Sequence, residues 1–259
     1  MTTDQKKNTT QNAEVWEALR MVLWAFLLIV LIEIVFGRIL GKMKIVIMEM
    51  FIVVPAFILV LVKKYNIRKS FRLNPVTHGV ILSAFVTGLG LSVIIDEADR
   101  LLQMFFPYSA EILRSLTEFL KCRSFNEFLI VGIGVAVVAP LTEESLFRGF
   151  VQQRLEVATD VTRGILLTSL VFGIIHLNPW AFIQIILLGV FMGVFAQKTN
   201  SIIPSVIIHS INNFLAFIFI NAKPSDIAWY LSGNHVSPQV LAAGAALTVA
   251  GFLLLNKNI

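Results

Sequence analysis

The stretch IVIMEMFIVVPAFILVLV, residues 45–62, is followed directly by KKYNIRKSFR, residues 63–72. The first stretch approaches the about 20 apolar residues that a helix needs to cross the hydrocarbon layer of a membrane. The second is strongly basic, and basic loops beside apolar segments stay on the cytoplasmic side. Together the two stretches predict a membrane-spanning helix that ends at the cytoplasmic surface.

The composition of the whole chain agrees with a membrane protein. Hydrophobic residues make up 57% and charged residues 14%, whereas globular domains carry about 25% charged residues; the mean hydropathy is +0.82. A disordered chain is excluded by the hydrophobicity, and a disulfide scaffold by the single cysteine, Cys122. Although the net charge is +5, the basic residues lie between apolar runs, so we expect the lipid bilayer and not nucleic acid as their partner.

The apolar runs predict an all-α, polytopic bundle of about eight transmembrane helices. They lie at about 21–37, 45–62, 78–95, 127–147, 164–177, 181–197, 203–220 and 236–255. A polar N-terminal tail, residues 1–20, precedes a single membrane domain, residues 21–259. Lysine and arginine are more frequent in the loops on the side of the N-terminus, so both termini are expected in the cytoplasm.

Residues 98–121 do not read as a span. Their apolar residues recur at helical spacing opposite charged ones, with Pro107 between two such runs. This pattern indicates two short amphipathic helices in the membrane interface, with an ordinary connector as the alternative.

Three polar clusters interrupt the apolar second half of the chain. Ionisable groups at membrane depth are costly, so they are candidates for function. The first cluster holds Glu143, Glu144 and Arg148. Glu144 and Arg148 are four residues apart and can pair on one helical face, while Glu143 points about 100° away and is free for another partner. The alternative is a solvated helix exit.

The second and third clusters each place a histidine in an apolar helix. FGIIH runs from Phe172 to His176, and HSINN runs from His209 to Asn213. Either histidine alone could be a packing residue. Because both occur together with Glu143 in the apolar half of the chain, we expect all three to line a shared polar cavity in the bundle. His78 and His235, at a helix start and in a polar loop, are given no role.

Two kinds of hydrolytic chemistry suit these residues, and the residues alone do not decide between them. A carboxylate beside a neutral imidazole can deprotonate a water, and histidine and asparagine can stabilise the oxyanion. Alternatively, Glu143, His176 and His209 can be the three ligands of a catalytic zinc. The HExxH zinc motif, the GxSG nucleophile motif and the GxGD aspartate motif are missing. Because GxSG is absent and Cys122 has no histidine near it in the sequence, nucleophilic serine and cysteine mechanisms are disfavoured.

The three clusters in this order resemble the signature of the CAAX protease and bacteriocin-processing family, also called the Abi or type II CAAX prenyl endopeptidase family. Its motifs EExxxR, FxxxH and HxxxN read EESLFR, FGIIH and HSINN here, within a core at about 125–220. The resemblance implies an intramembrane endopeptidase open to the cytoplasm. By the family's pattern Glu143 and His176 activate the water, and His209 and Asn213 stabilise the oxyanion.

The resemblance also implies supporting roles for Glu144, Arg148 and Phe172 around the site. No cofactor is favoured, because Asn213 is a poor zinc ligand and a good oxyanion donor; zinc is the alternative. The substrate is expected to be a hydrophobic or lipidated peptide, and the location the plasma membrane if the protein is prokaryotic. A non-catalytic immunity or scaffold protein with the same fold is the main alternative function, and a proton-conducting transporter is a further one.

Overall fold

A computed structural model describes the backbone of residues 3–259 and the side chains of residues 11–259 except Leu116. Helices dominate it. They are α1 (Thr3–Phe36), η1 (Gly41–Met43), α2 (Lys44–Ile52), α3 (Val54–Val62), α4 (Ile67–Ser70), α5 (His78–Phe105), α6 (Ala110–Leu120), α7 (Phe125–Ile133), η2 (Gly134–Val138), α8 (Ala139–Glu144), η3 (Ser145–Val151), α9 (Gln152–Ala158), α10 (Val161–Ile175), α11 (Phe182–Thr199), α12 (Ile203–Asn221), η4 (Pro224–Ile227) and α13 (Pro238–Asn258). A two-stranded hairpin, β1 (Leu231–Ser232) with β2 (His235–Val236), precedes α13.

The all-α, polytopic architecture is confirmed. Within the described residues, seven helical segments are long and apolar enough to cross a membrane, namely Gln11–Phe36, Gly41–Val62, His78–Phe105, Phe125–Ala158, Phe182–Thr199, Ile203–Asn221 and Pro238–Asn258. The eighth expected span, α10, has 15 residues and rises only about 22 Å. It is therefore shorter than the hydrocarbon layer, which is about 30 Å thick.

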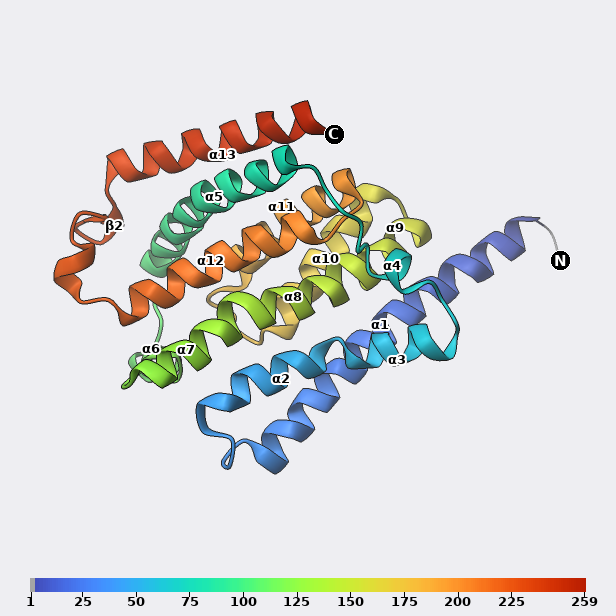
Figure 1. Ribbon diagram of the computed structural model, residues 1–259, viewed down its shortest axis with the longest axis horizontal. Coiled ribbons are helices and arrows are strands. Elements are labelled where there is room, and N and C mark those ends of the chain that lie inside the picture. Colours follow the sequence, from blue (N-terminus) through green and yellow to red (C-terminus); the bar gives the residue numbers. More distant parts are fainter. Residues whose placement is uncertain (1–2) are drawn as a thin grey trace.

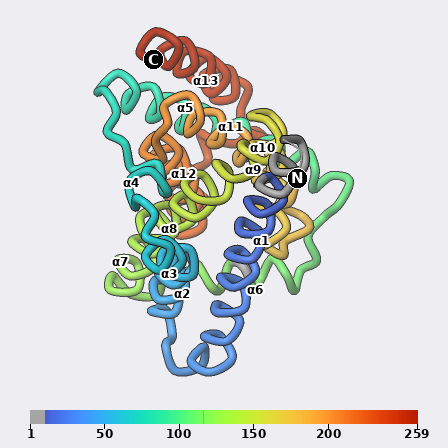
Figure 2. Tube along the Cα trace, turned by 90° about the vertical axis from the view of Figure 1, so that its right-hand side faces the viewer, coloured from blue at the N-terminus to red at the C-terminus, as the bar shows by residue number. Residues whose placement is uncertain are grey.

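The helices lie roughly alongside one another, with α13 and α5 at one side of the bundle and α1 to α3 at the other (Figure 1). The view turned by 90° shows the same separation, with α8, α11 and α12 between these two groups (Figure 2). The main hydrophobic core collects buried side chains from both ends of the chain, among them Ala18, Phe147, Phe172, Ile208 and Leu255. The motif-bearing helices therefore lie in the centre of the bundle.

Helices α5 and α13 pack closely because glycines face each other's backbone. A Cβ atom at Gly90 would lie 2.6 Å from the backbone nitrogen of Thr248, and one at Gly251 would lie 2.7 Å from that of Thr87. Small residues allow helices in membranes to approach in this way. This contact attaches the C-terminal helix to α5.

The segment 98–121 corrects one expectation from the sequence. Residues 98–105 are not a separate interfacial helix; they continue α5, since its helical pattern has no breaker before Pro107. Charged side chains in this part of α5 have hydrogen-bond partners near β2. Glu97 bonds to His235 Nδ1 at 2.7 Å, and Arg100 donates to the carbonyl oxygen of Asn234 at 3.3 Å. The second half, α6, is a separate amphipathic helix.

The polar N-terminal segment is helical from Thr3 on and continues into the first span as one helix, α1. Its Glu17 is buried and accepts hydrogen bonds from Arg154 of α9 at 2.9 Å and from Lys63 at 2.5 Å. These ion pairs fix α1 against the end of the motif-bearing helix. Residues 11–20 thus help to form the bundle.

Candidate active site

The EESLFR motif lies on a helix that changes its winding twice. Residues 125–158 run continuously through α7, η2, α8, η3 and α9, and both η2 and η3 are π-helical. Glu143 and Glu144 are the last residues of α8, directly before η3. Short π-helical segments inside α-helices frequently occur at functional sites, because they reorient neighbouring side chains.

Glu144 and Arg148 form the predicted ion pair. Arg148 Nη1 lies 2.9 Å from Glu144 Oε1, and both side chains are completely buried. Arg148 Nη2 also donates to the carbonyl oxygen of Gly189 on α11 at 3.3 Å, and the guanidinium lies 4.4 Å from the ring centre of Phe172. Two charges out of water need such additional partners, since Coulomb attraction alone does not always offset their desolvation.

His209 on α12 contacts both adjacent glutamates. Its Nδ1 lies 3.0 Å from Glu144 Oε1, and its Nε2 lies 3.9 Å from Glu143 Oε2. A carboxylate only accepts hydrogen bonds, so the 3.0 Å contact requires a hydrogen on Nδ1. The other ring nitrogen is thereby directed toward Glu143. The spacing of the motifs along the chain predicts that the clusters meet, and for Glu143, Glu144 and His209 this is confirmed.

His176 caps the end of α10 and does not pair with either glutamate. Its Nδ1 lies 2.6 Å from the carbonyl oxygen of Phe172, so this nitrogen carries the hydrogen and Nε2 keeps a lone pair. The Phe172 ring lies between the two histidines, with ring centres 4.6 Å from His176 and 5.9 Å from His209. Phe172 therefore sets the separation of the two imidazoles.

Asn213 lies one helical turn after His209, on the same side of α12. Its Nδ2 donates to the carbonyl oxygen of Val135 in the π-helical segment η2 at 3.1 Å. An amide nitrogen carries two hydrogens, so one is left for another acceptor. His209 and Asn213 thus both face the motif-bearing helix.

Glu49 is a further acidic residue at this site, and it was missed in the sequence. It lies on α2, which packs against α8, and its carboxyl group is near that of Glu143, so the two can share a hydrogen bond only if one of them carries a proton. One oxygen each of Glu49, Glu143 and Glu144 is buried without a hydrogen-bond partner among the described residues. A sequence signal for Glu49 exists, because it is the one charged residue in the apolar stretch 45–62. A charge inside a membrane span is costly, and this makes such a residue a candidate for function.

The donor set does not fit a zinc site. No group of three or more histidine, cysteine, aspartate or glutamate side chains within the described part of the chain could hold a metal ion. His209 Nε2 lies 3.9 Å from Glu143 Oε2, but the Phe172 ring packs against the imidazoles of both His176 and His209, and the three candidate ligands do not converge on one point. We therefore derive no step through a metal.

The glutamates and His209 are closed off from solvent in this structure. Glu143, Glu144 and His209 are buried, while His176 is exposed. The four principal cavities found among the described residues are not lined by Glu143, His176, His209 or Asn213. The expected shared polar cavity is thus a packed cluster, because Phe172 and Arg148 fill the space between the helices. His78 and His235 lie apart from it, at the start of α5 and on β2.

Comparison with known proteins matches a protein-family model to residues 125–215. No curated protein and no solved structure matches the chain. The matched segment, residues 125–215, contains all three motifs, from the start of α7 to the middle of α12. Together with the seven apolar helices, it makes the chain a multi-pass integral membrane protein. The family model that matches is the type II CAAX prenyl endopeptidase, Rce1-like model, so the family resemblance carried by the motifs is confirmed over residues 125–215.

Proposed function

We propose that this protein is an intramembrane endopeptidase that hydrolyses peptide bonds of membrane-associated proteins or peptides, including C-terminally prenylated ones. The observation that carries the proposal is the contact of His209 with both Glu143 and Glu144, inside the segment that matches the family model. Buried carboxylates beside imidazoles are suited to activate water.

In the proposed mechanism Glu143 is the general base. Its carboxylate accepts a proton from a water molecule, and His176 Nε2 accepts a hydrogen bond from the same water. The lone pair on Nε2 is available because Nδ1 donates to the carbonyl oxygen of Phe172. The water oxygen bonds to the carbonyl carbon of the peptide, and the proton passes from Glu143 to the amide nitrogen as the C–N bond breaks.

The negative charge that develops on the carbonyl oxygen is stabilised from α12. For His209 to donate from Nε2 as well as from Nδ1, its ring must carry a hydrogen on both nitrogens in this step, and Asn213 donates its second amide hydrogen. Glu144 accepts from Nδ1 and thereby orients the ring, and Arg148 holds Glu144 in place. Removing one such donor typically lowers kcat by about 10²- to 10³-fold.

The proposal uses the protein's own side chains and no resident metal, in keeping with the donor set. We also propose that both termini lie in the cytoplasm, because the basic stretch at residues 63–72 follows the second span. The site would then be reached from the side on which lipidated substrates are presented.

The test is cleavage of a fluorogenic peptide with a prenylated C-terminus by the purified protein in detergent. Glu143→Gln keeps the size and hydrogen bonding of the side chain but removes the base, so we expect kcat to fall by about 10²- to 10⁴-fold. Glu111→Gln, an exposed carboxylate at the start of α6, is the matched control and should cleave like the parent.

Equal cleavage by Glu143→Gln and the parent would reject Glu143 as the base. If neither prenylated nor unmodified hydrophobic peptides are cleaved by the folded parent protein, the non-catalytic scaffold with the same fold is the better explanation.

A further inference from the structure

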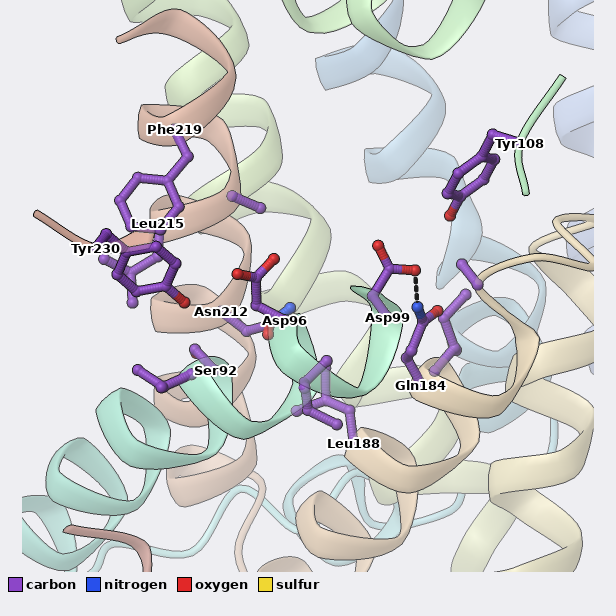
Figure 3. A pocket seen from close by; sticks show the side chains of 15 residues that line it. Ser92, Asp96, Asp99, Tyr108, Gln184, Leu188, Asn212, Leu215, Phe219 and Tyr230 are labelled. Atoms are coloured by element: carbon purple, nitrogen blue, oxygen red, sulfur yellow. Dashed lines mark hydrogen bonds between the residues drawn. The ribbon is translucent and has the colours of Figure 1, made fainter. Parts of the chain in front are cut away.

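A cavity with several polar side chains lies between α5, α11 and α12 (Figure 3). Its volume is about 280 Å³. Asp96 and Asp99 line it from α5, Gln184 from α11 and Asn212 from α12. His209 and Asn213 of the candidate active site face α8 and η2 instead. The cavity is therefore separate from the proposed peptidase site and serves no step of the mechanism above.

The charges around the cavity do not cancel. Asp96 pairs with Arg100 at 3.0 Å. Asp99 accepts hydrogen bonds from the neutral side chains of Gln103 and Gln184, and in the described part of the chain it has no ion-pair partner. One negative charge is thus left in a span, where charges are costly unless they are compensated.

The two tyrosines at the cavity do not supply the missing positive charge. Tyr108 lines the cavity near Asp99, and Tyr230 lines it near Asp96. Burial raises the pKa of Tyr108 to about 12 and also raises the pKa of Tyr230, so both hydroxyls keep their protons and act as donors. As neutral side chains they leave the net charge unchanged.

Gln184 adds an acceptor that is not used. Its side chain is 5% exposed, and its Nε2 donates to Asp99. Its Oε1 is buried and, among the described residues, has no hydrogen-bond partner. Figure 3 shows the amide beside the Asp99 carboxylate at the cavity. A buried acceptor without a donor costs free energy, so a donor-bearing ligand would be favoured here.

Apart from Ser92, the rest of the lining is apolar. Leu188 comes from α11, and Leu215 and Phe219 come from α12. Figure 3 shows Phe219 and Leu215 beside Tyr230, away from the Asp99 and Gln184 pair. The cavity therefore has an acidic, acceptor-rich end and an apolar end. Ligand sites commonly combine an apolar lining with a few polar groups in this way.

We propose that this cavity binds an ammonium group that carries an apolar chain. A primary ammonium has three hydrogen-bond donors, no acceptor and a single positive charge. It compensates Asp99, donates to Gln184 Oε1 and places its chain against Leu215 and Phe219. Such a group is found on free alkylamines and on the ethanolamine headgroup of lipids.

The test is calorimetric titration of the full chain in maltoside micelles with decylammonium, with decanol as the neutral probe of equal chain length. We expect decylammonium to bind at least about tenfold more tightly, as expected for one charge-assisted hydrogen bond. Asp99→Asn should remove this difference. Asp160→Asn, an exposed residue at the start of α10, is the matched control and should retain it.

Ala216→Phe is the second variant, because it fills the cavity without changing any charge. It should abolish decylammonium binding even if Asp99→Asn folds poorly. Competition by phosphatidylethanolamine, but not by phosphatidylcholine, would identify a lipid headgroup as the natural source, and no competition by either would identify a free amine. Equal binding of decylammonium and decanol, or unchanged binding by Ala216→Phe, would overturn the proposal. Because the readout is binding, it is independent of peptidase activity.

Discussion

Arg148 is the charged residue whose removal should affect folding most. Its ion pair with Glu144 is completely buried, so Arg148→Ala leaves the carboxylate without its strongest partner and without water. Removing one partner of such a pair costs about 3 to 5 kcal/mol. The carbonyl oxygen of Gly189 also loses its donor, but this loss involves the same side chain and is not counted separately. We therefore expect the free energy of unfolding to fall by about 3 to 5 kcal/mol.

The chain contains a matched control for this variant. Arg114 and Glu118 on α6 have the same residue types, the same spacing and an N···O distance of 3.0 Å, but their side chains are 79% and 61% exposed. Exposed pairs contribute about 0 to 1 kcal/mol because water and salt screen them. Arg114→Ala should therefore change stability little, and the difference between the two variants measures the effect of burial.

The assay is unfolding by sodium dodecyl sulfate in mixed maltoside micelles, followed by circular dichroism, with peptide cleavage measured on the same samples. We expect Arg148→Ala to lose both stability and cleavage. A free energy of unfolding within about 1 kcal/mol of the Arg114→Ala value would refute the reasoning. If Arg148→Ala were stable and inactive, Arg148 would belong to substrate binding instead of to support of Glu144.

Three further predictions concern the site. Glu49→Gln can still donate a hydrogen bond to Glu143 and should cleave within about tenfold of the parent, whereas Glu49→Ala should lose more; equal rates for both would mean that Glu49 does not position Glu143. Chelation until no stoichiometric zinc remains should leave cleavage intact; loss that zinc restores would reinstate Glu143, His176 and His209 as ligands. Because α10 is short, the end that carries His176 should be reached by water: in a Cys122→Ser background, Leu177→Cys should react with a water-soluble maleimide in native membranes faster than the mid-helix Leu166→Cys, and equal rates would contradict this.

Spacing within one helix was the most reliable guide to the site. Residues four apart on a helix lie on one face, and this predicts the Glu144–Arg148 pair without any knowledge of the rest of the chain. The all-α bundle can also be predicted from the sequence alone. A long apolar segment in a membrane must satisfy its backbone hydrogen bonds within itself, and an α-helix does this.

Helix ends were harder to predict, because they depend on contacts with distant parts of the chain. The charges at residues 96–100 interrupt the apolar run, so the span was expected to end near residue 95. The structure continues α5 to Phe105, and the charged groups find partners in the segment before α13, more than 130 residues later in the sequence. Such partners are not visible in a local pattern.

From the sequence we could predict that the three motifs meet, but not which atoms of different helices contact each other. His209 is an example. Motif order brings His209 to the glutamates, but it does not say which nitrogen meets which carboxylate. In the structure Nδ1 bonds to Glu144 and Nε2 is directed toward Glu143, and Glu143 lies near the carboxyl group of Glu49 of α2. Glu49 lies outside the segment that matches the family model. The environment of the proposed base is therefore completed by the N-terminal half of the chain, and a variant there can change the chemistry of a motif that it does not belong to.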